Sequence, residues 1–232
     1  MIRKYENEDK ALVAVDCIIF GFDQEQLKLL LIKRDFEPEK GRWSLMGGFL
    51  KMDETVDEAA VRVLRTLTGL QEVFMEQLRV FSKIDRDPVQ RTVSVAYYAL
   101  INIQDHNKEL IKKYSAEWFE LSKKPKLIFD HDSMVEEAIK CLRTEISLRP
   151  MGFELLPEKF TMRQLQKLYE AILGQKLDKR NFIKKINSLD ILSKLDEKDM
   201  TSSKKGSYLF KFNQTKHHDK NGLVSSGSKF NW

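Results

Sequence analysis

Acidic side chains gather around one predicted helix start in a pattern that can bind a divalent metal ion. Asp53, Asp57 and Glu58 lie within a stretch of six residues. Carboxylate oxygens are the usual ligands of Mg²⁺, which neutralises phosphate oxygens and activates water when a diphosphate is cleaved. Acidic residues in the first turn of a helix are also explained by capping and by the helix dipole. These residues alone therefore leave open both a metal site and an ordinary helix start.

A longer pattern runs through the same segment and resembles that of the Nudix hydrolases, G-x5-E-x7-R-E-U-x-E-E-x-G-U, in which U is aliphatic. Six positions of this sequence fit it: Gly48, Glu54, Arg62, Leu64, Gly69 and Leu70. The other three glutamates are replaced by Val63, Thr66 and Leu67, which offer no carboxylate to a metal ion. We therefore expect a Nudix-like fold that does not cleave diphosphates and has no catalytic residue, bound metal or cofactor. Glu54 and Arg62 are expected to form an ion pair with a structural role.

A second group of side chains suits nucleic acid. In the predicted helix 177–189, Phe182 and Ile186 fall on one side, at about 100° per residue, and Arg180, Asn181 and Lys184 on the other. Arginine binds guanine, asparagine binds adenine, and lysine and serine bind phosphates or bases. Lys204 and Lys205 sit at the tip of a predicted hairpin, which suits contact with the phosphate backbone. The predicted DNA-binding residues are Arg163, Lys179, Arg180, Asn181, Lys184, Lys185, Ser188, Lys204 and Lys205.

The net charge of +5 is distributed unevenly. Residues 151–232 contain 16 Lys and Arg against 9 Asp and Glu, whereas residues 1–150 contain 24 against 26. A basic excess confined to the last third of the chain suggests a polyanionic partner for that part, although a solvated basic face is a common alternative. The helix order and the basic hairpin tip, taken with this charge, favour DNA.

Hydrophobic periodicity predicts the elements that position these residues. Strands are expected at 11–20, 27–34, 78–84 and 92–103, with short extended pieces at 115–121 and 125–129. Helices are expected from Thr55, which caps with Glu58, to Gly69, and over 132–148. Beyond Pro150, a helix from Thr161 to Gly174, a second over 177–189 and strands at 191–195 and 207–212 give the winged-helix order.

These elements define the fold class: an α/β (α+β) Nudix-like mixed-sheet domain followed by a winged helix-turn-helix domain. The expected boundaries are residues 1–148 for the effector-sensing domain, 149–156 for a linker and 157–232 for the DNA-binding domain. Cys17 and Cys141 lie in apolar runs and are expected to be buried free thiols. The polar N-terminus and the lack of an apolar run of about 20 residues predict a cytoplasmic protein without membrane association.

The chain as a whole resembles the Nudix-related transcriptional regulators, in which a Nudix-like domain precedes a winged helix. The segments that carry the resemblance include GRWSLMGGF, VSVAYYALI, DHDSMVEEAI and GFELLPEKFTMRQLQKLYEAILGQKLDKRNFIKKI. The resemblance implies a homodimer that binds palindromic double-stranded operator DNA, as a repressor, and leaves it when an effector binds. One branch of the family responds to ADP-ribose and another to pentoses such as L-arabinose; we expect the pentose branch, with ADP-ribose as the alternative.

The residues themselves leave the effector open. A neutral sugar needs carboxylates and an aromatic wall, for which the candidates are Asp16, Trp43, Phe49, Glu54 and Asp85. A diphosphate needs cations, for which the candidates are Lys33, Arg34, Arg42, Lys51 and Arg86. Two further hypotheses remain: a residual Mg²⁺-dependent nucleoside diphosphate hydrolase, and a ligand-binding scaffold whose winged helix contacts protein instead of DNA.

Overall fold

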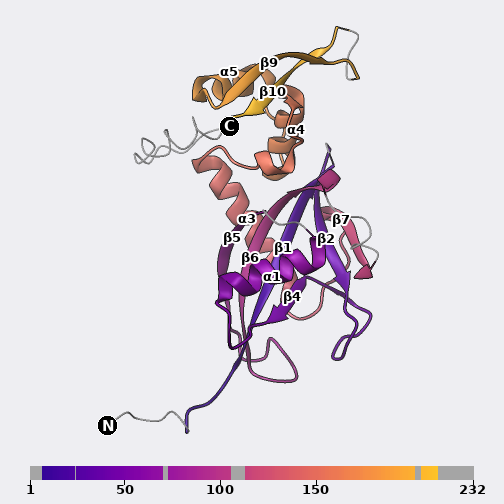
Figure 1. The fold of residues 1–232 in the computed structure, drawn as a ribbon, viewed down its shortest axis with the longest axis vertical. Helices are drawn as coiled ribbons and strands as arrows, with labels where there is room; N and C mark the ends of the chain where they lie inside the picture. The colour runs from indigo at the N-terminus through magenta and orange to yellow at the C-terminus, as the bar shows by residue number, and fades with distance from the viewer. Residues whose placement is uncertain (1–6, 24, 70–72, 106–112, 202–204, 214–232) are drawn as a thin grey trace, which may run out of the picture.

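A mixed β-sheet of seven strands forms the centre of the first domain (Figure 1) in the computed structural model, which describes residues 7–23, 25–69, 73–105, 113–201 and 205–213. Its strand order is β3-β2-β1-β6-β5, with β4 paired to β1 and β7 paired to β2. Strands β1 and β6 are parallel, and the other pairs are antiparallel. The strands are β1 Leu12–Phe22, β2 Leu27–Lys33, β3 Trp43–Ser44, β4 Met46–Phe49, β5 Phe74–Phe81, β6 Thr92–Asn102 and β7 Ala116–Glu120.

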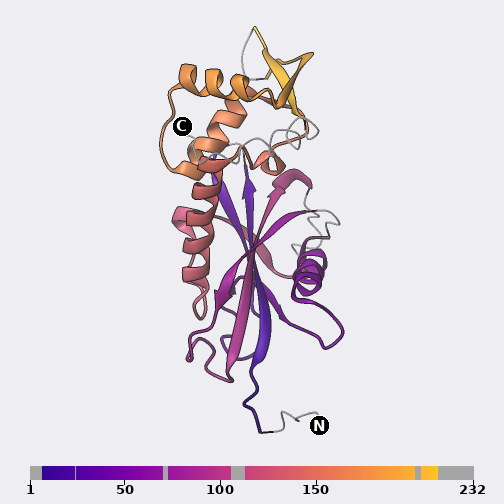
Figure 2. The same cartoon turned by 90° about the vertical axis from the view of Figure 1, so that its left-hand side faces the viewer.

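Two helices, α1 (Val56–Thr68) and α3 (His131–Leu148), cover opposite faces of this sheet (Figure 2). Successive side chains of a strand point to opposite faces, so β1 supplies both hydrophobic cores. Ile18 and Phe20 pack on the α3 side, and Cys17 and Ile19 on the α1 side. All four are fully buried, which explains why β1 is an almost continuous apolar run.

The predicted ends of α1 are confirmed. The Thr55 hydroxyl accepts a hydrogen bond from the backbone N–H of Glu58, and the Glu58 carboxylate accepts one from the backbone N–H of Thr55. Gly69 ends the helix with a φ of 74°, which glycine adopts without a steric penalty. Two short 3₁₀ turns, η1 (Ile103–Asp105) and η2 (Leu121–Lys123), follow β6 and β7.

The second domain has the predicted winged-helix order, with a third strand that the sequence analysis did not expect. Thr161 caps α4 together with Gln164, and the Asp178 carboxylate accepts a hydrogen bond from the backbone N–H of Asn181 at the start of α5. Strands β8, β10 and β9 form an antiparallel sheet in that order. The elements are η3 Phe153–Leu155, β8 Phe160–Thr161, α4 Met162–Leu173, α5 Lys179–Leu189, β9 Leu192–Asp199 and β10 Ser207–Phe212.

The predicted linker, residues 149–156, is packed rather than loose. Met151, Phe153, Leu155 and Leu156 are buried and belong to the same hydrophobic cluster as Phe22 of β1. The winged helix is therefore continuous with the core on the α3 side of the sheet. Of the described helices, none is long and apolar enough to cross a membrane.

Three predicted segments differ from the structure. Strand β5 begins at Phe74, four residues early, because it pairs with β6 as far as Leu100. Residues 125–129 form no strand. The backbone N–H of Ile128 donates to the Trp43 carbonyl of β3, but that of Leu127 donates to the Asp132 carboxylate, so no regular ladder forms. Strand β9 continues to Asp199, where it pairs with Ser207 of β10.

The two cysteines also differ from one another. Cys17 is buried as predicted, whereas Cys141 is only partly buried, and both thiols are free. The Cys141 position on α3 lies at the edge of the apolar stripe, next to the fully buried Leu142. Apolar neighbours in the sequence do not show whether a helical residue is buried, because successive residues of a helix point about 100° apart.

Candidate effector pocket and DNA-binding surface

A cavity of about 230 Å³ lies on the α3 side of the sheet, between β1, β2, β4 and the start of α3. Charged groups of both signs line it: Asp16, Arg34, Asp35, Arg86 and Asp87, together with His131. The walls also include Phe36, Phe49 and Phe129. Aromatic surfaces combined with a few polar groups are the usual composition of a small-molecule site.

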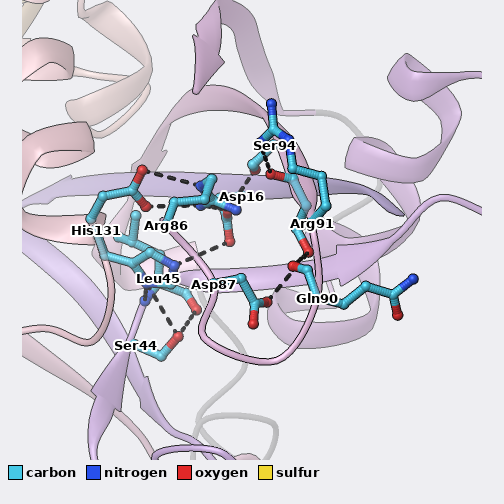
Figure 3. A network of polar contacts seen from close by, with 11 residues as sticks. Asp16, Ser44, Leu45, Arg86, Asp87, Gln90, Arg91, Ser94 and His131 are labelled. Carbon is cyan, nitrogen blue, oxygen red and sulfur yellow. Dashed lines mark hydrogen bonds and ion pairs between the residues drawn. The ribbon is translucent and has the colours of Figure 1, made fainter. Parts of the chain in front are cut away.

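Arg86 is the central group of this cavity (Figure 3). Its Nε and Nη2 atoms donate to the two carboxylate oxygens of Asp130, at 3.1 and 2.9 Å. Nη2 also lies 3.5 Å from Oδ2 of Asp16, which accepts a hydrogen bond from the Ser94 hydroxyl at 2.6 Å. The Arg86 side chain is only 3% exposed, and an unpaired charge at such a position would be costly. The carboxylates of Asp130 and Asp16 balance its charge inside the protein.

His131, the first residue of α3, closes the inner end of the cavity. The backbone N–H of Leu45 donates to His131 Nδ1 at 3.1 Å, so Nδ1 is an acceptor and the proton of the neutral ring is assigned to Nε2. Nε2 lies 3.7 Å from Oδ1 of Asp16. Burial lowers the pKa of His131, despite the opposing effect of the nearby carboxylates of Asp16 and Asp130.

The glycine at position 47 is required by the close approach of two strands. Gly47 pairs with Asp16 across β4 and β1, and a Cβ at this position would collide with the Asp16 carboxylate. A side chain here would force the buried Asp16 carboxylate to move. One glycine of the Gly-Gly pair is therefore explained by the architecture of this cavity.

Arg34 forms the outer cationic group. Its guanidinium carbon lies 3.8 Å from the ring centroid of Phe36 and 5.4 Å from that of Phe129, and its Nε donates to the Phe36 carbonyl at 3.1 Å. Burial lowers the pKa of Arg34, although the guanidinium stays charged at neutral pH. Phe36 is 52% exposed and Phe49 48% exposed, so the mouth of the cavity presents open aromatic surfaces.

The structure brings only some of the predicted effector residues to this cavity. Asp16, Phe49, Arg86 and Arg34 line it. The residues that do not line it are Trp43, Glu54, Asp85, Lys33, Arg42 and Lys51. Trp43 instead packs edge-on against Phe119, with the ring centroids 4.8 Å apart, because its side of β3 faces the core.

Three residues of this network were missed in the sequence analysis. Asp130 and His131 were placed before or at the start of an ordinary helix, and Ser94 in an ordinary strand. No local pattern marks them, since they meet Asp16 and Arg86 only through contacts between residues 44 to 115 positions apart along the chain.

The Glu54–Arg62 ion pair is confirmed as a contact between loop and helix. Arg62 Nε and Nη2 donate to the two oxygens of Glu54 at 2.7 and 2.5 Å, and the backbone N–H of Lys51 donates to Glu54 at 2.9 Å. These hydrogen bonds lower the pKa of Glu54 to about 2. Val63, at a position where the Nudix pattern has glutamate, is buried in the core on the α1 side.

Two of the three candidate substitutes for the missing glutamates have other partners, and the third, Asp53, is exposed. The Tyr97 hydroxyl donates to Asp57, and Glu58 belongs to the capping arrangement with Thr55. Within the described ranges, no group of three or more His, Cys, Asp or Glu side chains is placed to hold a metal ion. Leu67 lies in α1, and its side chain is outside the described part.

The predicted polar face of α5 is exposed in the structure. Arg180, Asn181, Lys184 and Ser188 are all exposed, whereas Phe182 and Ile186 are buried against α4 and the core. Among the other predicted DNA-binding residues, Lys179, Arg163 and Lys205 are exposed and Lys185 is half-buried. Lys204 lies outside the described residues.

A groove of about 680 Å³ separates α5 from the β9–β10 wing. Arg163 and Lys179 line it together with Lys194 of β9 and Tyr208 of β10. The ammonium groups of Lys194 and Lys198 lie 3.6 and 4.8 Å from the Tyr208 ring centroid. These three wing residues were not predicted. Lys198 lies in the part of β9 that was expected to be loop, whereas Lys194 and Tyr208 lie in predicted strands and meet only through the pairing of β9 with β10.

Comparisons with known proteins match both domains. Residues 10–138 match the NUDIX domain, and residues 152–212 match the NrtR DNA-binding winged helix domain. A relative in Acinetobacter baylyi, described as an ADPR responsive transcriptional repressor, NtrR, is 32% identical over 91% of this chain and 86% of its own length. An ADP-ribose pyrophosphatase of Methanocaldococcus jannaschii is 37% identical over 60% of this chain and 79% of its own length.

Solved structures extend the likeness to the whole fold. The crystal structure of Shewanella oneidensis NrtR complexed with a 27mer DNA aligns with a TM-score of 0.80 at 28% identity, over 89% of this chain and 95% of that one. The NUDIX domain of the same Shewanella protein complexed with ADP ribose aligns with a TM-score of 0.50 at 27% identity, over 60% of this chain and 94% of that one.

A Nudix domain joined to a DNA-binding winged helix defines a two-domain transcriptional regulator. This chain belongs to the NrtR family of such regulators. The expectation of a pentose effector, L-arabinose, finds no support in these relatives, whose names and ligands refer to ADP-ribose. The preference for the pentose branch rested on the resemblance alone, since no residue of the chain favoured a neutral sugar.

Proposed function

We propose that this regulator is a repressor that binds palindromic operator DNA as a homodimer and releases it when ADP-ribose enters the cavity beside α3. The observation that carries the proposal is the pair of guanidinium groups, Arg34 and Arg86, in one cavity. Guanidinium groups bind phosphates through paired N–H donors, and two such cations complement the charge of a diphosphate, which a neutral sugar lacks. The effectors named for the relatives support the same ligand.

The remaining lining groups fit the other parts of ADP-ribose. Asp35 and Asp87 offer carboxylate acceptors to ribose hydroxyls, and Phe36 offers an exposed ring on which adenine can stack. At about 230 Å³ the cavity is smaller than the 300–1,000 Å³ that is common for small-molecule sites. We therefore place only one part of the ligand inside it, with the rest lying along the open mouth.

The proposed DNA contacts combine α5 and the wing. Arg180, Asn181 and Lys184 face outward from α5 and supply base contacts in a major groove. Arg163, Lys179, Lys194 and Lys205 flank them and supply phosphate contacts. A two-fold dimer on a two-fold operator places two such helices in successive major grooves.

The same cavity is proposed to bind its ligand without cleaving it. Diphosphate cleavage by a Nudix enzyme needs helix carboxylates to hold Mg²⁺, and Val63, Thr66 and Leu67 occupy three of those positions. The likeness to the Methanocaldococcus pyrophosphatase therefore extends to the fold and not, in this proposal, to the reaction. Formation of AMP from ADP-ribose in the presence of Mg²⁺ would contradict this part.

Fluorescence anisotropy with labelled upstream DNA tests the proposal directly. We expect salt-sensitive, sequence-specific binding that is lost on addition of ADP-ribose and unaffected by L-arabinose at the same concentration. Arg34→Gln should leave operator binding intact and require more ADP-ribose for release, because it removes a cation from the mouth of the cavity. Operator binding that is insensitive to ADP-ribose would refute the effector, and absence of binding to any upstream fragment would refute the DNA-binding role.

A further inference from the structure

Helix α3 begins at the cavity, which His131 lines, and runs along the sheet to the winged-helix domain (Figure 2). At its start, Asp130 and His131 belong to the polar network of the cavity. Near its end, Arg143 Nε donates to the carbonyl of Ile172, in the last turn of α4, at 2.8 Å. A movement of α3 along or across the sheet would therefore reach the winged helix through α4.

Asp130 has two possible partners, and the structure shows it with one of them. It occupies the N-cap position of α3, where an aspartate ordinarily accepts a hydrogen bond from the backbone N–H two or three residues ahead. Its side chain makes no such capping bond. Both of its oxygens instead accept hydrogen bonds from Arg86.

The atoms of Arg86 that hold Asp130 form one of the two guanidinium edges that can bind the oxygens of an anionic ligand. The Nε and Nη2 edge of a guanidinium fits the two oxygens of a carboxylate or of a phosphate, but not both at once. Asp130 occupies that edge, while Arg86 itself lines the cavity. A phosphate that binds this edge must displace Asp130.

We infer that the diphosphate of the effector displaces Asp130 from Arg86, and that Asp130 then caps α3 and shifts it, which carries the signal to the DNA-binding domain. The inference rests on the proposed function and specifies its regulation. Capping offsets part of the loss of the ion pair, and the phosphate replaces the Asp130 carboxylate as the partner of Arg86, so the bound ligand can favour the second arrangement. The Arg86–Asp130 pair thus belongs to the DNA-binding state.

The far end of α3 has the contacts to transmit such a shift. Arg143 bonds the end of α4, and the Tyr169 ring of α4 packs edge-on against Phe182 of α5, with the centroids 5.4 Å apart. Arg149, which directly follows α3, is held by Glu76 of β5 at 2.6 Å and by Glu145 at 2.8 Å. Arg143 is therefore the polar link between α3 and the winged helix, while Arg149 holds the end of α3 to the sheet.

The substitution Asp130→Asn separates the two roles of this residue. Asparagine is as good an N-cap as aspartate, but it cannot form the charged bidentate pair with Arg86. We expect the full-length Asp130→Asn variant to bind ADP-ribose at least about fivefold more tightly than the wild type does, a change typical of allosteric coupling. The same variant should bind the operator more weakly than the wild type. Isothermal titration with ADP-ribose and anisotropy with operator DNA measure the two affinities.

Asp132→Asn is the matched control. Asp132 lies in the same first turn and bonds Lys124 and the backbone of Leu127, away from Arg86. It should keep wild-type affinities for both ligands and a wild-type response to ADP-ribose. Arg143→Gln should bind ADP-ribose with wild-type affinity but no longer release the operator when ADP-ribose is added.

The outcomes distinguish this inference from the proposed function. If ADP-ribose fails to release the wild-type protein from DNA, the proposed function is wrong. If the wild type responds but Asp130→Asn binds ADP-ribose no more tightly, the displacement of Asp130 is wrong. A fold defect would weaken the binding of both ligands together. If Arg143→Gln still releases the operator when ADP-ribose is added, the Arg143–Ile172 hydrogen bond is not the route, even if Asp130→Asn behaves as expected.

Discussion

Arg62 holds both carboxylate oxygens of Glu54, at 2.7 and 2.5 Å, although the residues that would share a metal ion with Glu54 in a Nudix enzyme are absent from this chain. The pair ties the loop after β4 to helix α1. Two positions of the Nudix pattern, Glu54 and Arg62, are therefore explained by structure.

The Glu54–Arg62 pair should make the protein more sensitive to acid. The folded-state pKa of Glu54 is about 2, below the ordinary value of 4.5. The ion pair therefore contributes fully to the free energy of unfolding above pH 4.5, and this contribution is lost as the pH falls toward 2. Glu54→Gln should reduce the dependence of unfolding free energy on pH in this range. Urea unfolding at pH 6 and pH 3.5 measures it, and an unchanged dependence would show that Arg62 does not hold the carboxylate in solution.

Returning glutamate to two positions of the Nudix pattern should have unequal costs. Val63 is 4% exposed and packs in the core, so Val63→Glu should lower the free energy of unfolding by about 3 kcal/mol through an unpaired buried charge. Thr66 is exposed, so Thr66→Glu should change the free energy of unfolding by less than about 0.5 kcal/mol. Urea unfolding of both variants compares them; equal costs would argue against the described packing of Val63.

His131 should make the protein less stable in mild acid. Burial lowers its folded-state pKa, so the unfolded chain takes up a proton first, below about pH 6.5, and stability falls from there until the folded-state pKa is reached. His131→Asn should remove this part of the pH dependence. Urea unfolding of both proteins at pH 7.5 and pH 5.5 tests this prediction. It is wrong if the stability of His131→Asn falls as steeply between the two pH values as that of the wild type.

Arg180 should determine base preference. It is exposed on α5 on the side opposite the buried Phe182, so Arg180→Ala should weaken operator binding by about 1–3 kcal/mol and relax selectivity at one base pair. Lys205→Ala, beside the wing tip, should instead weaken binding to all sequences alike. Anisotropy with single-base operator variants separates the two effects; an unchanged profile for Arg180→Ala would exclude it from base contacts.

Lys194, which only the structure drew attention to, should contribute to phosphate binding. Its ammonium lies 3.6 Å from the Tyr208 ring centroid, in the groove between α5 and the wing. Lys194→Gln should lower the slope of log affinity against log salt by about one. Lys123→Gln is the control, since Lys123 is 73% exposed on the first domain and bonds Glu120. Equal slopes in the wild type and Lys194→Gln would remove the wing groove from the DNA-binding surface.

Several local features of this protein can be predicted from the order of its residues. The capping arrangement of Thr55 with Glu58, the helix ends at Gly69 and Gly174, and the polar face of α5 all follow from interactions within a few residues. The loss of the metal-binding glutamates is likewise a property of the residues themselves. Those features sufficed for the fold class and for a DNA-binding regulator, although not for its effector.

The residues that form the cavity are brought together by packing between distant parts of the chain. Asp16, Arg86 and His131 lie on a strand, a loop and a helix, and parallel pairing of β1 with β6 and packing of α3 on the sheet bring them together. Trp43, Glu54 and Asp85 have equally suitable chemistry but are not in this cavity. Residue type sets what a side chain can bind, whereas the register of the sheet and the packing of α3 set which side chains meet.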